Sequence, residues 1–219
     1  MTPFWIKVCG PTTVENAVML AECGVDAVGL NFYPKSSRFV TDEVAKSIAW
    51  ELRGRVELVG LFVDRPQEAV MATARTIGLN ALQTYDFEPV TGLLPYMHLP
   101  SFRVKSADDL VAIQAYVQRF RPQAVLVDSF VPGALGGTGV AAPWQLLTGF
   151  DAGVPWILAG GLTPENVAEA IRIARPAGVD VASGVESRPG VKDRGRVTAF
   201  VAAARQAAAE IRGSARRDS

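Results

Sequence analysis

Two residues with acid–base chemistry stand at the ends of short apolar runs. Cys9 ends the run 5–9, and Asp128 ends the run 124–128. A thiolate can act as a base, and a partly desolvated carboxyl group has a pKa raised toward that of a general acid. Most free cysteines are small buried residues, and a carboxylate can also cap the segment that follows it. Because a loop rather than a helix follows Asp128, we interpret the two residues as a candidate acid and base.

Two charged residues lie inside the first and last apolar runs. Lys7 precedes Cys9 by two positions, so their side chains share one face of a strand. A neighbouring ammonium group lowers the pKa of a thiol, and we expect Lys7 to do so for Cys9. Asp180 lies in the run 179–182. If the first and last strands are neighbours, we expect Asp180 to pair with Lys7 and to orient the site.

Glycine turns follow the last two apolar runs, at Gly160-Gly161 and at Ser183-Gly184. Glycine lets the backbone approach an anion, to which its N–H groups can donate. A single turn of this kind is more often a tight connection between a strand and a helix. Two on consecutive strands predict a phosphate site, because a closed β/α barrel commonly holds a phosphate there.

Arg38 ends a polar segment at 31–38 that follows the second apolar run. A guanidinium group suits a planar carboxylate because it can donate two parallel hydrogen bonds, although most loop arginines are simply solvated. His98 is the single histidine. It lies away from any predicted strand end, so we expect a structural role for it.

The segment 129–141 is the longest expected connector and is rich in glycine. It is either a lid that closes on glycine hinges or a plain connector, and composition alone does not separate the two. The lid residues would be Gly136, Gly137, Thr138 and Gly139.

Short apolar runs alternate with longer amphipathic segments along the whole chain. The runs lie at 5–9, 27–32, 57–63, 81–84, 101–104, 124–128, 156–159 and 179–182. They are too short for buried helices and are bounded by Gly and Pro. Strict alternation predicts a parallel sheet with right-handed crossovers, and eight units favour closure. The expected fold class is therefore α/β, a parallel eight-stranded (β/α)8 barrel of the TIM type that binds phosphate.

Several intervening segments carry helix start or stop signals. Thr12 with Glu15 suggests a capping box, and Thr41, Ser106 and Thr163 are further capping candidates. Helix ends are expected at Gly24 and Gly78. A fourth helix should lie within 87–98, where prolines leave little room for it.

The composition describes a globular domain without a charged partner. Of 219 residues, 49% are hydrophobic, and 22 basic residues balance 22 acidic ones. We expect no nucleic-acid or membrane partner, and no run has the roughly eighteen apolar residues that a membrane span needs. Two cysteines and no apolar core of signal-peptide length within 1–7 indicate a cytoplasmic location. One domain should cover 1–212, with a disordered tail at 213–219.

Taken in order, these landmarks resemble the phosphoribosylanthranilate isomerase family of tryptophan biosynthesis, and they cover nearly the whole chain. The matching stretches are Lys7-Val8-Cys9-Gly10, Gly29-Leu30-Asn31-Phe32 with Ser36-Ser37-Arg38, Val59-Gly60-Leu61-Phe62-Val63, Leu126-Val127-Asp128, Gly136-Gly137-Thr138-Gly139, Ala159-Gly160-Gly161-Leu162 and Val179-Asp180-Val181-Ala182-Ser183-Gly184-Val185-Glu186.

The resemblance implies an Amadori rearrangement, an aldose–ketose isomerisation of N-(5-phosphoribosyl)anthranilate. Asp128 would protonate the ribose ring oxygen, Cys9 would remove the C2′ proton, and Arg38 would hold the anthranilate carboxylate. The glycine turns would hold the phosphate. The remaining substrate-binding candidates are Lys7, Gln83 and Asp180. The partner would be a small sugar phosphate, without metal or redox cofactor, and the chain would be a monomer or a homodimer.

The fourth strand departs from the family pattern. Where Gln-x-His-Gly is usual, this chain has Gln83-Thr84-Tyr85-Asp86, and Pro11 follows Cys9-Gly10 where an apolar residue is usual. An altered substrate or a non-catalytic phosphate-binding barrel is therefore an alternative. A histidine-pathway isomerase would need paired aspartates, which Cys9 argues against.

Overall fold

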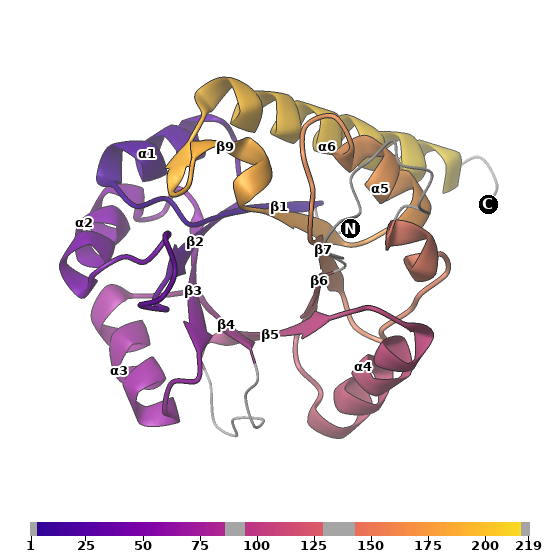
Figure 1. Cartoon of the computed structure of the whole chain (residues 1–219), viewed down its shortest axis with the longest axis horizontal. Helices are drawn as coiled ribbons and strands as arrows, with labels where there is room; N and C mark the ends of the chain where they lie inside the picture. Colours follow the sequence, from indigo (N-terminus) through magenta and orange to yellow (C-terminus); the bar gives the residue numbers. More distant parts are fainter. Residues whose placement is uncertain (1–3, 86–94, 129–142, 216–219) are drawn as a thin grey trace.

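Eight parallel strands close into a barrel in sequence order in the computed structural model, which describes residues 4–85, 95–128 and 143–215. The strands are β1 (Trp5–Cys9), β2 (Ala27–Asn31), β3 (Glu57–Val63), β4 (Ala81–Tyr85), β5 (Met97–Arg103), β6 (Val125–Asp128), β7 (Trp156–Ala159) and β8 (Gly178–Val181). β8 pairs with β1 and completes the ring. Figure 1 shows the ring of strands with the helices outside it. The predicted (β/α)8 barrel is confirmed.

Helices cover the outer surface of the barrel. They are α1 (Val14–Glu22), α2 (Asp42–Leu52), α3 (Gln67–Ile77), α4 (Ala107–Phe120), α5 (Val167–Ala174) and α6 (Arg194–Ala215). α6 runs along one side of the molecule, next to α5 (Figure 1). Among the described helices, none is long and apolar enough to cross a membrane.

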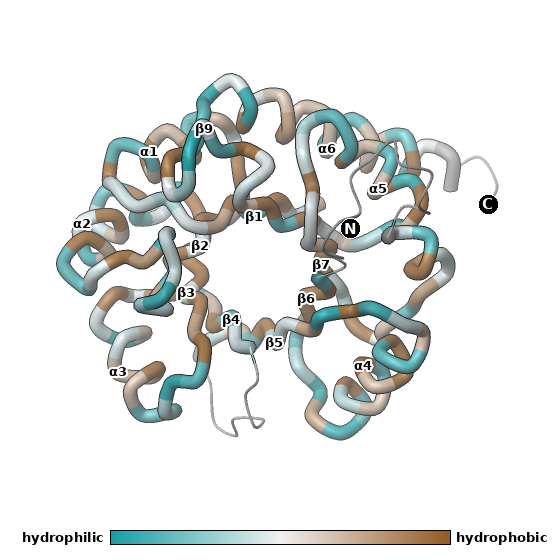
Figure 2. Tube along the Cα trace, viewed as in Figure 1, coloured by the Kyte–Doolittle hydropathy of each residue, from teal (hydrophilic) through white to brown (hydrophobic). Residues whose placement is uncertain are grey.

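Apolar side chains fill both sides of the strands, which is why the strands read as continuous apolar runs. The larger cluster lies between strands and helices and includes Val8, Val28 and Phe200. Smaller clusters face the barrel interior, among them Leu99, Leu126 and Ile157. The hydropathy colouring of Figure 2 shows a mostly hydrophobic ring of strands.

Most helix boundaries follow the local signals. Thr41 caps α2, Ser106 and Asp109 form a capping box at α4, and Gly78 ends α3 with a positive φ of 77°. The capping box predicted for Thr12 is wrong, because the Thr13 side chain accepts the capping bond from Asn16. The Thr12 hydroxyl instead donates to the carbonyl of Gly190, 178 positions away in sequence.

α5 and α6 also differ from their predicted limits. α5 begins at Val167 after a turn, with Asn166 at its N-cap position, and the Thr163 hydroxyl accepts from the Glu165 backbone N–H within that turn. α6 continues to Ala215, beyond the predicted boundary at 212.

Strand β5 and a small hairpin differ from the pattern prediction. β5 begins at Met97 rather than 101, and Pro100 within it breaks the β-propensity signal. After β8, the strands β9 (Glu186–Arg188) and β10 (Val191–Lys192) form an antiparallel pair that is too short to leave a periodic pattern. Most of the stretch where a fourth helix was expected, and the whole candidate lid at 129–141, lie outside the described residues.

Candidate active site

A cavity of about 300 Å³ lies at the carboxyl ends of the barrel strands. Eight of the predicted site residues line it: Cys9, Arg38, Gln83, Asp128, Gly160, Gly161, Asp180 and Ser183. Lys7 is fully buried beside Asp180, and Gly184 directly follows Ser183. The four candidate lid residues lie outside the described part of the chain.

Barrel closure brings Lys7 and Asp180 together, as predicted. The two residues are register partners on β1 and β8, and Lys7 Nζ donates to Asp180 Oδ1 at 2.8 Å. Burial acts to lower the pKa of Lys7, but the charges of Asp180 and Cys9 and the hydrogen bonds with both residues together outweigh it, and the pKa is raised. Lys7 is therefore a buried ammonium group, held in place by a contact across 173 positions.

The expectation that Lys7 would lower the pKa of Cys9 is wrong in its net result. Burial raises the pKa of the Cys9 thiol, Lys7 offsets this only in part, and the charge of Asp180 adds to the increase. An ammonium group paired with a carboxylate leaves the thiol little net positive charge, whereas the loss of water around the thiolate remains. Cys9 is therefore mainly a thiol at neutral pH.

Gly29 on β2 makes room for this pair of side chains. A Cβ atom at position 29 would lie 2.8 Å from Cys9 Sγ and 3.0 Å from Lys7 Cε. Any larger residue would therefore displace the thiol or the ammonium group.

Asp128 ends β6, three strands from Cys9 around the barrel. Its register partners are Arg103 on β5 and Ala159 on β7. Its side chain lines the same cavity as the Cys9 thiol. An acid and a base can therefore act on one molecule bound between them.

Strand β4 contributes two polar side chains to the same cavity. Gln83 is buried and its Oε1 atom has no hydrogen-bond partner among the described residues, while its Nε2 lies 3.4 Å from the Tyr85 hydroxyl. Burial raises the pKa of Tyr85, and the charges of Asp128, Asp180 and Cys9 add to the increase, so the phenol is neutral. The strand therefore presents a neutral hydroxyl donor and an unused acceptor.

Arg38 reaches the cavity but is already paired. Its Nε and Nη2 atoms donate to the two carboxylate oxygens of Glu186 at 2.8 and 2.7 Å. Lys192 Nζ donates to Glu186 Oε1 at 2.7 Å. Burial acts to raise the pKa of Glu186, but the hydrogen bonds from Arg38 and Lys192 and the charges of both together outweigh it, and the pKa is lowered. Asn31 shapes the loop that carries Arg38, since its amide donates to Ser36 Oγ, which also accepts from the Arg38 backbone N–H.

The two glycine turns lie against each other at the rim. Gly160 and Gly161 have φ values of 96° and 63°, in the left-handed region that favours glycine. At Gly184 an added Cβ would lie 1.9 Å from the carbonyl oxygen of Leu162, so only glycine fits there. Within the described residues, the backbone N–H groups of Gly161 and Leu162 donate to no other atom. These groups could bind an anion.

Sequence reasoning missed Asn31, Glu186 and Lys192 as parts of the site. Glu186 and Lys192 belong to the short hairpin β9–β10. In such a short segment, a charged residue is expected from the sequence to be exposed to solvent. The signal that could have found Glu186 was its place directly after the Ser183-Gly184-Val185 turn.

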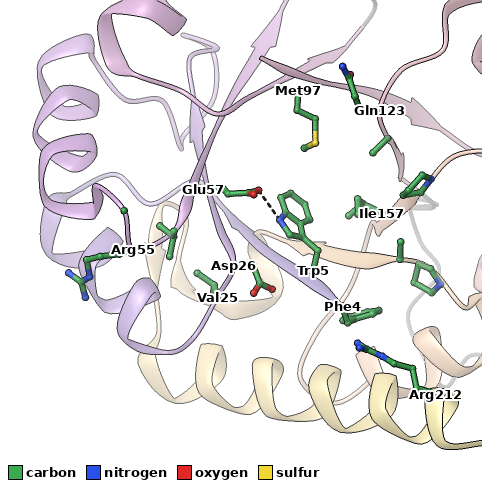
Figure 3. A pocket seen from close by; sticks show the side chains of 16 residues that line it. Phe4, Trp5, Val25, Asp26, Arg55, Glu57, Met97, Gln123, Ile157 and Arg212 are labelled. Carbon is green, nitrogen blue, oxygen red and sulfur yellow. Dashed lines mark hydrogen bonds between the residues drawn. The ribbon is translucent and has the colours of Figure 1, made fainter. Parts of the chain in front are cut away.

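A second cavity, of about 1180 Å³, lies at the amino-terminal end of the barrel (Figure 3). Trp5, Met97 and Ile157 contribute apolar walls, and the Trp5 indole N–H donates to Glu57 at 3.0 Å. Barrel enzymes carry their chemistry at the opposite end. The candidate acid, base and guanidinium group all lie at the carboxyl-terminal end, in the smaller cavity.

The described residues hold no group of three or more His, Cys, Asp or Glu side chains that could bind a metal ion. The chemistry available in the smaller cavity is that of a thiol, carboxyl groups, a guanidinium group, amides and a phenol.

A parallel eight-stranded barrel with a cavity lined by a thiol and carboxyl groups at its carboxyl end is an enzyme architecture. The family model for N-(5'-phosphoribosyl)anthranilate (PRA) isomerase matches residues 6–203. The chain belongs to this family.

Curated relatives agree with this assignment. An N-(5'-phosphoribosyl)anthranilate isomerase of Myxococcus xanthus is 43% identical over 203 residues, 91% of this chain and 95% of the relative. One from a Geobacter species is 40% identical over 203 residues, 92% of this chain and 98% of the relative.

Solved structures of lower sequence identity share the fold. A phosphoribosyl anthranilate isomerase from Thermotoga maritima has a TM-score of 0.82 and 35% identity, covering 92% of this chain and 98% of that one. Another phosphoribosyl anthranilate isomerase, in complex with reduced 1-(o-carboxyphenylamino)-1-deoxyribulose 5-phosphate, has a TM-score of 0.80 and 34% identity over the same shares.

Proposed function

We propose that this chain isomerises N-(5-phosphoribosyl)anthranilate to 1-(o-carboxyphenylamino)-1-deoxyribulose 5-phosphate in tryptophan biosynthesis, with Asp128 as general acid and Cys9 as general base. The observation that carries the proposal is the shared cavity, in which a thiol, a carboxyl group and a guanidinium group meet two glycine turns. Membership of the isomerase family supports the substrate.

The reaction begins with ring opening. Asp128 donates a proton to the ribose ring oxygen, the bond from that oxygen to C1′ breaks, and the anthranilate nitrogen takes up the positive charge as an iminium ion. Cys9 then removes the proton from C2′, and the electron pair of that C–H bond neutralises the iminium. The resulting enolamine tautomerises to the ketone, so no redox or metal cofactor is needed.

The other groups hold the substrate. Arg38 is assigned to the anthranilate carboxylate, and the turns at Gly160-Gly161 and Ser183-Gly184 to the phosphate. The N–H groups of Gly161 and Leu162, which donate to no atom of the described part of the chain, support the phosphate assignment. Gln83 and Asp180 are assigned to the cavity wall around the sugar, and Lys7 to substrate binding through its contact with Asp180. The substrate is a small molecule, and the proposal includes a cytoplasmic monomer or homodimer, since one solved relative is described as dimeric.

The loss of anthranilate fluorescence with freshly made phosphoribosylanthranilate tests this function. Cys9→Ala and Asp128→Asn should each lower kcat by roughly 100-fold or more with a modest change in KM, because each removes one proton transfer. Cys23→Ala is the matched control, since Cys23 is the C-cap of α1 and lies outside the cavity.

Two outcomes contradict the proposal in different ways. Near-normal rates in both variants rule out the assigned acid and base. If the wild-type protein shows no turnover, the chain has a different substrate or a binding function. Tyr85, which stands where the family pattern has histidine at the end of β4, would then be the first residue to account for the change.

A further inference from the structure

Arg38 is held along one edge of its guanidinium group and is open along another. The bidentate contact with Glu186 uses Nε and one N–H of Nη2. A guanidinium group has five N–H donors in one plane, so the edge formed by Nη1 and Nη2 keeps the rest. No atom among the described residues accepts a hydrogen bond from Nη1. Glu186 can therefore fix the orientation of Arg38 while the free edge receives a carboxylate.

The charge balance of this contact is unfavourable for an anionic ligand unless a third group takes part. Arg38 and Glu186 together have no net charge, and a second carboxylate arriving at Arg38 would be repelled by Glu186. Lys192 supplies the missing cation: its Nζ donates to Glu186 Oε1 at 2.7 Å and to the carbonyl of Ala182 at 3.1 Å. The three side chains together carry one positive charge.

The trio of Arg38, Glu186 and Lys192 is more buried than an ordinary network of ion pairs at a protein surface. Glu186 is 8% exposed and Lys192 is 3% exposed. Burying an ion costs free energy that a solvated pair does not, so charges in such positions need close partners. Because water is largely excluded, each charge also acts more strongly on its neighbours than it would at the surface.

The short hairpin after β8 holds the two residues in place. Glu186 on β9 and Lys192 on β10 are register partners. Asn16 on α1 anchors β10, since its side chain accepts from the Lys192 backbone N–H at 2.7 Å and donates to the Lys192 carbonyl at 3.0 Å. The Gly190 N–H donates to Glu186 Oε1 at 3.2 Å. The trio is therefore pre-organised before any ligand binds.

We propose that Glu186 and Lys192 are positioning residues for substrate recognition, in which Glu186 orients Arg38 and Lys192 restores the positive charge that attracts the aromatic carboxylate. The inference rests on the proposed function for the identity of that carboxylate. It assigns the β9–β10 hairpin a role in specificity rather than in proton transfer.

Steady-state kinetics of Lys192→Met with phosphoribosylanthranilate test the charge role. We expect KM to rise about tenfold or more and kcat to fall much less, because a ground-state carboxylate contact is weakened. Asp128 and Cys9 stay in place, and Cys9 loses the smaller of the two lysine charges that act on it. Lys192→Arg keeps the charge and should recover most of the affinity. Arg172→Met removes a cation from an exposed ion pair with Glu210 and should behave as wild type.

Two inhibitors separate recognition of the carboxylate from general damage. The reduced carboxyphenylamino-deoxyribulose phosphate carries the aromatic carboxylate, and ribose 5-phosphate lacks it. Lys192→Met and Glu186→Gln should weaken the first by about tenfold and leave the second within about twofold. If both inhibitors weaken equally in a variant whose circular dichroism is native, the residues act on the fold and the proposal is wrong.

A double-mutant comparison tests the route through Arg38. In an Arg38→Met background, Lys192→Met should cause little further loss of affinity for the analogue, since both changes act on one contact. Fully additive losses contradict the proposal. If wild type turns over phosphoribosylanthranilate and Lys192→Met has an unchanged KM, this inference fails and the proposed function stands. Absence of wild-type turnover instead overturns the function, and calorimetric binding of the analogue still reports on the trio.

Discussion

The candidate base Cys9 is a thiol surrounded by charges and shielded from water. Lys7 and Lys192 act to stabilise its thiolate, but burial, with a further contribution from Asp180, raises its pKa overall. The free protein therefore holds Cys9 mainly as a thiol, and only a minority of molecules carry the thiolate that proton abstraction needs.

Alkylation of Cys9 measures this directly. In a Cys23→Ser background, the rate with iodoacetamide should rise about tenfold per pH unit and should not level off below about pH 9, because only the thiolate reacts. The same protein unfolded in denaturant should level off near the ordinary thiol pKa. A plateau near neutral pH in the folded protein would contradict a raised pKa.

Tyr85 is the residue at which this chain differs from the family pattern within the cavity. Its phenol lies 3.4 Å from Gln83 Nε2 and is kept neutral, so it can act as a hydrogen-bond donor to a bound sugar. Tyr85→Phe should lower kcat/KM by roughly three- to tenfold, the worth of one neutral hydrogen bond. Tyr85→His should retain more activity than Tyr85→Phe. Equal rates in wild type and Tyr85→Phe would show that the hydroxyl does not contact the substrate.

At the scale of elements, neighbouring strands determine where the reactive side chains lie. β1 carries Lys7 and Cys9, β8 supplies the counter-charge Asp180, and β2 supplies the gap at Gly29. The position and the charge environment of a reactive group at a strand end therefore depend on the two neighbouring strands. For Cys9, the partner residue on β8 lies far from it in sequence.

Gly29→Ala tests this control. The added methyl group would meet Cys9 Sγ at 2.8 Å, so we expect a loss of kcat of about tenfold or more and a destabilisation of roughly 1–3 kcal/mol from overpacking. Gly195→Ala is the matched control, because its Cβ would meet only Asp193 Oδ1, at 3.3 Å. Unchanged activity in Gly29→Ala would mean that the barrel interior can relax without moving the thiol.

At the scale of the whole molecule, the outward face of the barrel strands buries polar groups that influence its stability. His98 on β5 lies 3.0 Å from Thr84 Oγ1 on β4, and burial lowers the pKa of His98 to about 4. It is the single histidine of the chain, so its effect can be isolated.

Acid should therefore destabilise the protein through His98. In the unfolded chain this side chain binds a proton below about pH 6.5, whereas in the folded protein it does so only near pH 4. The stability that is present above pH 6.5 is therefore lost as the pH falls toward 4. We expect a loss of roughly 2 kcal/mol in the free energy of unfolding between pH 7 and 4.5. Urea unfolding of wild type and His98→Gln should show this as a difference in pH slope, and parallel slopes would contradict it.

The sequence by itself determined the order of strands and helices, their closure into eight units, and the strand ends at Cys9 and Asp128. Apolar periodicity, caps and turns are local properties, and a closed parallel barrel leaves few ways to connect them. The pairing of Lys7 with Asp180 could also be predicted, because closure makes the first and last strands neighbours.

Only the tertiary structure decided the electrostatics of the site. The raised pKa of Cys9 depends on how far water is excluded, and the contact of Arg38 with Glu186 joins residues 148 positions apart through a hairpin with no periodic signal. Residue types are visible in a sequence, but desolvation and partner choice depend on distances that exist only once the chain has folded.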